Sequence, residues 1–84
     1  LSTEESQHNE IKVYPNPIDS VIKVENFTET KIDIIINNIS GKVVKKTNSQ
    51  KTYIEIPFDS IASGVYFVNV KSKTKASTFK IIKE

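Results

Sequence analysis

The chain has 84 residues, and its twelve basic residues, all lysine, stand against ten acidic ones for a net charge of +2. A chain of this length forms one domain at most and buries roughly 60–65% of its unfolded surface. The absence of cysteine excludes disulfides, thiolate metal sites and cysteine nucleophiles. No apolar run approaches the roughly 20 residues of a membrane helix, and the interspersed lysine and glutamate do not form the clustered basic face of a nucleic-acid-binding protein.

Residues 1–10 contain a single apolar side chain and no periodic pattern. Such a segment cannot offset the entropy cost of being ordered, so we expect a flexible linker. The only histidine of the chain, His8, lies in it. A catalytic or metal-binding histidine needs partners held at fixed distances, which a flexible linker does not supply, so we expect neither role for His8.

The first strand is predicted at Ile11–Tyr14, where apolar and polar residues alternate. Pro15-Asn16-Pro17 follows at once and ends the strand, because each proline removes a backbone donor. Proline also restricts the residue before it, so Tyr14-Pro15-Asn16-Pro17 is a stiff, extended turn. It is either a rigid connector between strands or a recognition epitope.

The next two strands are predicted at Val21–Glu25 and Lys31–Asn37. In the latter, isoleucines at positions 32, 34 and 36 share one face, and the high isoleucine content predicts the central strand of a sheet. Phe27, in the turn between the two strands, is expected to cover the end of the core.

A fourth strand, Lys42–Thr47, carries three lysines and few apolar residues, which predicts an edge protected against aggregation. The turn before it contains Gly41, which is free to take a positive φ. Tyr53–Ile56 is the fifth strand, and Pro57 ends it.

The C-terminal part of the chain is predicted to be a connection followed by a hairpin. The connection runs from Phe58 to Gly64, with Phe58 and Ile61 as apolar anchors. In the first strand of the hairpin, Tyr66, Val68 and Val70 share an apolar face, and a second strand covers residues 78–82. Seven short strands without helical periodicity predict an all-β, two-sheet antiparallel sandwich over residues 11–84.

The sequence offers no set of residues for catalysis. Serine and threonine lack an imidazole partner, no Gly-rich loop can hold a phosphate, and no calcium-loop spacing is present. Asp19 and Asp59 occur singly in turns and are expected to bond nearby backbone amides. We therefore expect a binding or addressing function, with no enzyme activity, no cofactor and no metal.

Four segments in chain order carry a family resemblance: VYPNP at 13–17, NISGKVV at 38–44, IASGVYFV at 61–68 and TFKIIK at 78–83. Together they resemble the type A C-terminal sorting domain of the type IX secretion system of Bacteroidota. The family's usual aspartate before the Ser-Gly turn is replaced by Asn38-Ile39. The resemblance implies an Ig-like sandwich of seven strands, and covers residues 11–84.

The resemblance also implies a function and partners. It implies a secretion signal that directs an N-terminal cargo domain through the type IX translocon, with an outer-membrane shuttle barrel and a sortase-type protease as further partners. The cargo would pass through the periplasm and end secreted or at the cell surface, and the signal would be removed by cleavage within residues 1–10, without inserting into a membrane. The recognition residues that the motifs imply are Tyr14, Pro15, Asn16, Pro17, Gly41, Gly64, Tyr66, Lys80 and Lys83.

In physical terms, we expect such a signal to be read in the folded state. Lys80 and Lys83 would steer a partner by charge, while Gly64 and Tyr66 hold the shape of the hairpin. A free sheet edge is a further possible contact, by strand addition.

Two alternatives stay open from the sequence. A carbohydrate- or protein-binding module of a secreted enzyme would need an exposed aromatic platform. There is no tryptophan, and Tyr14 and Tyr53 are far apart in the sequence. A structural spacer or dimerisation module would need an apolar patch on an outer face, to which Ile35, Phe67 and Ile82 are candidate contributors.

Overall fold

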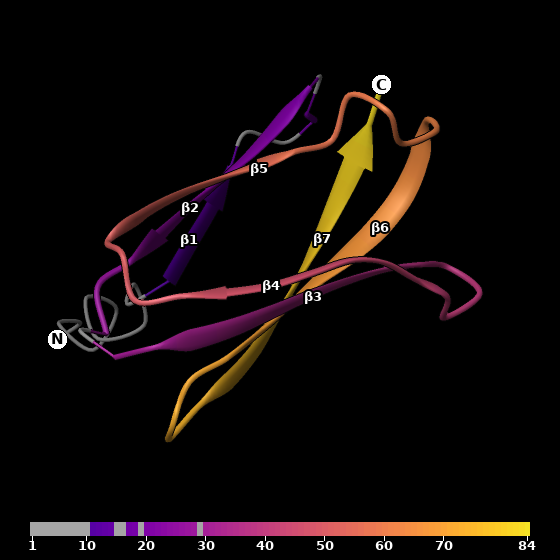
Figure 1. Cartoon of the computed structure of the whole chain (residues 1–84). Helices are drawn as coiled ribbons and strands as arrows, with labels where there is room; N and C mark the ends of the chain where they lie inside the picture. Colours follow the sequence, from indigo (N-terminus) through magenta and orange to yellow (C-terminus); the bar gives the residue numbers. More distant parts are fainter. Residues whose placement is uncertain (1–10, 15–16, 19, 29) are drawn as a thin grey trace, which may run out of the picture.

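The computed structural model describes residues 11–14, 17–18, 20–28 and 30–84. The seven strands are β1 (Ile11–Tyr14), β2 (Val21–Asn26), β3 (Ile32–Asn38), β4 (Val43–Ser49), β5 (Tyr53–Pro57), β6 (Gly64–Lys71) and β7 (Ala76–Lys83). They form a three-stranded sheet in the order β1-β2-β5 and a four-stranded sheet in the order β4-β3-β6-β7, stacked as two layers (Figure 1). Every pairing within the two sheets is antiparallel. The predicted all-β sandwich is therefore confirmed.

The strand order is that of an immunoglobulin-type sandwich with one change. In the constant-type immunoglobulin arrangement the fourth strand pairs with the fifth, whereas here β4 pairs with β3. The prediction that residues 42–47 form a lysine-rich edge strand is confirmed, because β4 is the outermost strand of its sheet. The prediction of a central strand at residues 31–37 is also confirmed, since β3 lies between β4 and β6.

Alternation along each strand decides which side chains enter the core. On β3 the isoleucines at 32, 34 and 36 are fully buried, and on β6 the buried residues are Tyr66, Val68 and Val70, as the period-two pattern predicts. On the three-stranded sheet, the face that turns towards these residues includes Val24 and its cross-strand partners Val13 and Ile54. Ile18, Ile22, Ile56, Phe58 and Ile81 complete the buried apolar set.

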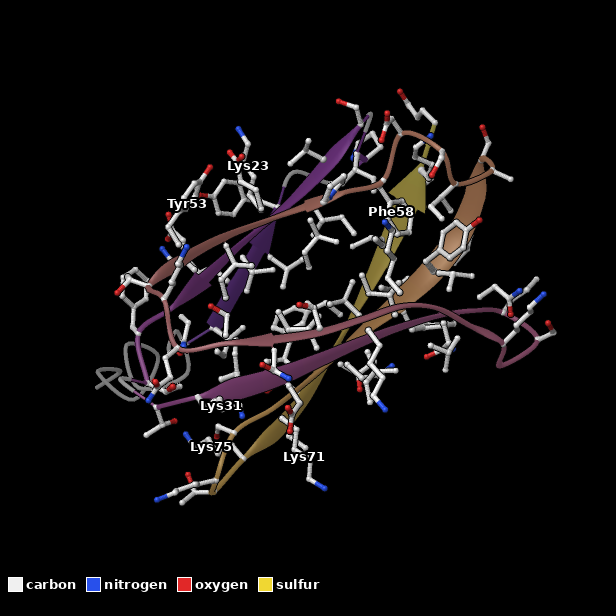
Figure 2. All side chains as sticks on the ribbon, in the orientation of Figure 1. Lys23, Lys31, Tyr53, Phe58, Lys71 and Lys75 are labelled. Atoms are coloured by element: carbon white, nitrogen blue, oxygen red, sulfur yellow. The ribbon has the colours of Figure 1, made fainter. Side chains whose placement is uncertain are left out.

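The connection between β5 and β6 closes the core with an aromatic side chain. Phe58 is fully buried and points between the two sheets (Figure 2), and Ile61 is half-buried against the same core. Both predicted anchors are confirmed. The same prediction for Phe27 is wrong, because its side chain is 49% exposed.

The register of β3 against β4 shifts between Ile36 and Asn37. An extra residue in one strand of an antiparallel pair bends that strand and re-aims its side chains. Val44 packs against the core, while Val43 pairs with Asn37 on the outer face and is 51% exposed. None of the described segments forms a helix long and apolar enough to cross a membrane.

Candidate recognition site

All four segments that carry the family resemblance reach the same end of the sandwich. The antiparallel registers Asn38 with Tyr66 and Gly64 with Lys83 bring the β3–β4 turn, the start of β6 and the end of β7 together. The end of β1 lies at this end as well, because Tyr14 pairs with Lys23 near the start of β2. We call this the signature end; its described residues are 14, 17–18, 38–43, 61–67 and 80–84. In Figure 1 it extends from the β5–β6 connection near the C label to the β3–β4 turn at the right.

Ile18 fastens the connection between β1 and β2 to the last residues of the chain. Its backbone N–H donates to the Ile82 carbonyl at 2.8 Å, and its carbonyl accepts from the Glu84 N–H at 3.1 Å. The two bonds form a parallel bridge centred on Lys83. Since the Ile18 side chain is only 1% exposed, this short segment is both paired with β7 and part of the core. Of the preceding motif, Pro17 is exposed, whereas Pro15, Asn16 and the predicted turn cap Asp19 lie outside the described residues.

Lys83 is buried, at 8% exposure, and its ammonium Nζ donates to the Ile61 carbonyl at 3.0 Å. Burying a charged group is unfavourable unless it is hydrogen-bonded, and this bond compensates part of that cost. The side chain therefore joins the end of β7 to the β5–β6 connection. Lys83 is not presented at the surface, contrary to the steering role that the motif implies, while Lys80 is exposed.

Tyr66 and Phe58 order the β5–β6 connection. The Tyr66 hydroxyl donates to the Ala62 carbonyl at 2.7 Å, and its ring meets that of Phe58 edge to face, with centroids 5.2 Å apart. A tyrosine at this corner that bonds the backbone a few residues upstream is a feature of immunoglobulin-like sandwiches. Gly64 has φ +150°, a value that L side chains rarely adopt. Both residues therefore lie at the corner that leads into β6, and their role in holding the hairpin for recognition stays a prediction.

Asn38 closes the turn between β3 and β4. Its side-chain Oδ1 accepts from the backbone N–H of Ser40 at 3.0 Å and of Lys42 at 2.9 Å. Gly41 has φ +91°, as predicted, and its N–H donates to the Asn38 carbonyl at 3.0 Å. The bonds use only the side-chain oxygen that asparagine shares with the family's aspartate, so the replacement keeps the turn.

Asn26 closes a turn in a similar way at the opposite end of the sandwich. It pairs with Ile11, the first residue of β1. Asn26 is 2% exposed; its Nδ2 donates to the Thr30 carbonyl and its Oδ1 accepts from the Thr28 N–H, both at 3.0 Å. The sequence does not predict this role for Asn26, because nothing local distinguishes a buried turn asparagine from an exposed one. Asp59, the other predicted turn cap, is exposed.

Tyr14 and Tyr53 lie on the same outer face, on either side of β2. Tyr14 pairs with Lys23 and Tyr53 pairs with Glu25, both on β2. The two tyrosines are therefore brought near each other despite their separation in the sequence. Figure 2 shows Tyr53 and Lys23 on the outside of the three-stranded sheet. Each hydroxyl donates to a glutamate: Tyr14 to Glu25 at 2.7 Å, and Tyr53 to Glu55 at 3.0 Å.

These bonds favour the neutral phenols. The hydrogen bond to Glu25 is the largest of the effects that raise the pKa of Tyr14 to about 12. Partial desolvation, followed by the bond to Glu55, raises the pKa of Tyr53. Within the described part of the chain, no three His, Asp or Glu side chains gather into a group suited to a metal ion.

Comparison with known proteins places these features in a family. The family model described as "Secretion system C-terminal sorting domain" matches residues 12–84. Beta-agarase A of Zobellia galactanivorans is 36% identical over 64 residues, which make up 74% of this chain and 12% of the agarase.

A solved structure is similar in fold. It comes from work on PorZ, an essential bacterial surface component of the type IX secretion system of Porphyromonas gingivalis, and matches with a TM-score of 0.71 and 22% identity over 99% of this chain and 12% of the other. That likeness shows the shared fold. The present chain thus spans about 12% of the length of either relative. With the family model matching nearly all of its described residues, the chain belongs to the C-terminal sorting domains of the type IX secretion system.

Proposed function

We propose that the signature end is the surface through which the type IX machinery recognises this secretion signal, and that it is recognised in the folded state. Membership of the family makes the chain a C-terminal secretion signal, which is not itself catalytic, and implies a secreted or cell-surface protein. The proposal assigns the surface of the domain that the machinery recognises.

The observation that carries the proposal is the convergence of the four motifs. They are separate in the sequence, yet the register pairs and the Ile18 bridge bring them to one end of the sandwich. β1 begins at the other end, opposite Asn26. A cargo joined N-terminally to the domain would approach from that end, so the signature end would point away from it.

The motif residues divide into two groups by their surroundings. Gly64, Tyr66 and Lys83 act through the shape of the signature end, because Tyr66 and Lys83 are buried and bonded to backbone carbonyls. Tyr14, Pro15, Asn16, Pro17, Gly41 and Lys80 are the candidates for direct contact with the translocon or the shuttle barrel after the cargo has crossed into the periplasm. Cleavage by a sortase-type protease within residues 1–10 would then release the cargo from the signal.

The test is export of a periplasmic reporter fused to residues 1–84 in a type IX-competent cell. Deleting residues 81–84 removes the strand end held by Ile18 and is expected to abolish surface display of the reporter. The matched control replaces Lys73 and Thr74 with alanine in the exposed β6–β7 turn at the other end of the sheet, and is expected to leave display unchanged. Display of the deleted form at the level of the full domain would refute the proposal.

One observation favours the alternative of a carbohydrate-binding module. Tyr14 and Tyr53 lie on one outer face, and Tyr53 is 46% exposed. Their hydroxyls are already bonded to glutamates, which leaves the rings as the surface for stacking on a sugar. Glycan-array binding that Tyr53→Ala removes, together with export that does not need the domain, would support this alternative.

A further inference from the structure

Exposed apolar side chains gather around the signature end. Among the described residues, five large hydrophobic side chains are exposed: Phe27, Ile39, Val43, Tyr53 and Ile82. Three of the five belong to the segments that carry the family resemblance, with Ile39 at 75%, Val43 at 51% and Ile82 at 44% exposure. Single exposed hydrophobics are ordinary, but a contiguous group of them marks an interaction surface.

The register of the four-stranded sheet makes Val43 and Ile82 part of one outer face. Val43 lies opposite Asn37, which in turn lies opposite Phe67, so these three cross the sheet in one row. Val65 lies opposite Ile82 in the next row towards the signature end. We call Val43, Val65, Phe67 and Ile82 the apolar patch. Ile35, one row further along β3, points to the same face, so the candidates for an apolar outer face do lie on one side.

The bulge in β3–β4 decides which valine belongs to the patch. Ile36 pairs with Lys45, so without the register shift Val44 would lie opposite Asn37 on the outer face, and Val43 would turn inward. With the shift, Val44 packs against the core while Val43 faces outward in the row of Phe67. The shift therefore places Val43 in the patch and Val44 against the core, one valine on each side of the sheet.

Charges around the patch are mostly positive. At the strand positions of this face, Lys46 pairs with Ile35, Lys71 with Asp33 and Lys80 with Phe67. These positions therefore carry three lysines and one aspartate. The outer face of the three-stranded sheet is balanced instead, with Lys12 and Lys23 against Glu25 and Glu55. The two outer faces of the sandwich therefore differ in both apolar content and charge.

We infer that the apolar patch, with its lysine surround, is a docking surface for a protein partner that offers apolar side chains flanked by carboxylates. This rests on the proposed function, since it identifies the chemistry of the partner that reads the signature end. A second copy of the same chain fits less well, because two such faces would bring lysines against lysines. The apolar centre would supply affinity, and the lysines would steer the encounter.

The first test uses variants matched in exposure. The patch variant combines Val43→Thr with Ile82→Thr and removes apolar surface at positions that are 51% and 44% exposed. The control variant combines Phe27→Thr with Tyr53→Thr, at positions that are 49% and 46% exposed and lie outside the patch. Threonine is β-branched and suits the three positions that lie in strands, and Phe27 lies in a turn outside the core, so both variants should fold, which circular dichroism would verify. We expect surface display of the fused reporter to fall at least tenfold for the patch variant and to stay unchanged for the control.

The second test addresses charge and the nature of the occupant. Lys46→Glu with Lys71→Glu is expected to reduce display several-fold, whereas Lys31→Glu with Lys51→Glu, at exposed positions off this face, is expected to have no effect. Sedimentation equilibrium of the wild-type chain at micromolar concentration is expected to give a monomer. A dimer that the patch variant dissociates would overturn the inference in favour of a second copy.

The outcomes separate the inference from the proposed function. If the wild-type domain does not display the reporter, the proposed function fails and the inference falls with it. If the wild-type domain displays the reporter and the folded patch variant does so equally well, the inference alone is overturned. Equal losses in the patch variant and its matched control would overturn it too.

Discussion

Tyr66 offers a quantitative test of how the signature end is held together. Its side chain is 6% exposed, its hydroxyl donates to the Ala62 carbonyl at 2.7 Å, and its ring packs edge to face on Phe58. Tyr66→Phe removes only the hydroxyl, while Tyr66→Ala removes the ring as well. The two substitutions therefore separate the hydrogen bond from the packing.

The structure sets the expected sizes of the two effects. A neutral hydrogen bond stabilises a protein by about 0.5–1.5 kcal/mol, and the exposed Ala62 can return its carbonyl to water, so we expect Tyr66→Phe to cost about 1 kcal/mol. Removal of a buried aromatic ring costs about 3–5 kcal/mol. A domain of this size has a total stability of about 4–13 kcal/mol, so Tyr66→Phe should stay folded and Tyr66→Ala should lose much of its stability.

The assay is thermal and urea unfolding of the 84-residue chain, followed by circular dichroism. A loss of 1 kcal/mol lowers the Tm of a domain this small by about 4–8 °C, which is the shift expected for Tyr66→Phe. Display of a reporter should survive Tyr66→Phe and fail with Tyr66→Ala at temperatures where that variant unfolds. Equal losses of stability for the two variants, or none for either, would refute the assignment of Tyr66 as the residue that orders this corner.

Three further predictions follow from the turns and the outer face. Gly41→Ala should cost about 1–2 kcal/mol in urea unfolding, because its φ of +91° strains any residue with a Cβ, although no atom lies within 4 Å of that position; unchanged stability would contradict the turn. Asn26→Ala should cost about 1–3 kcal/mol, since the buried side chain bonds the Thr30 carbonyl and closes the turn, and a loss confined to a few tenths would show that the bonds do not matter. The pKa of Tyr14 is raised to about 12, so the folded state holds the phenolic proton more tightly than the unfolded state does. The stability that the protonated Tyr14 contributes is therefore complete below pH 10 and is lost as the pH rises towards 12. Absorbance titration of the phenolates should show Glu25→Gln lowering that pKa, and an unaltered titration curve would contradict the role of the Tyr14–Glu25 bond.

The strands and their buried faces could be read from the sequence because alternation is a property of a single strand. The isoleucines of β3 and the apolar row of β6 each lie on one side of their own backbone, whatever the neighbouring strands are. The lysines of β4 likewise indicate an edge without knowledge of its partner. Gly41 could be placed because the turns that join hairpin strands often need a positive φ, which glycine adopts without strain.

The tertiary links at the signature end could not be predicted in the same way. Ile18 stands alone among turn residues and shows no periodicity, yet it is buried and bonded to residues at the other end of the chain. Lys83 looks like a surface charge in the sequence, although alternation along β7 puts it on the inward face with Ile81, and only the fold reveals that the Ile61 carbonyl is there to accept its Nζ. The prediction that Phe27 covers the end of the core is wrong, because nothing local to a turn reveals whether another segment covers its side chain.

The candidate site is therefore partly visible in the sequence and partly a product of the fold. The motifs name Gly64 and Tyr66, but their contacts with Phe58 and the corner backbone depend on how β5 leads into β6. Whether Val43 or Val44 belongs to the apolar patch depends on a register shift that no local pattern indicates. Its residues come from three strands, and the pairings of β3 with β4 and β6, and of β6 with β7, bring them together.

The central claim is that the machinery reads a folded sandwich. The most direct measurement compares surface display of a reporter fused to residues 64–84 with that of the same reporter fused to residues 1–84, in the same type IX-competent cells. The shorter fusion keeps β6, β7 and both C-terminal lysines but lacks Ile18, Phe58 and the facing sheet, so we expect no display from it and full display from the longer one. Equal display from both fusions would mean that a linear C-terminal segment is sufficient, and would contradict the account.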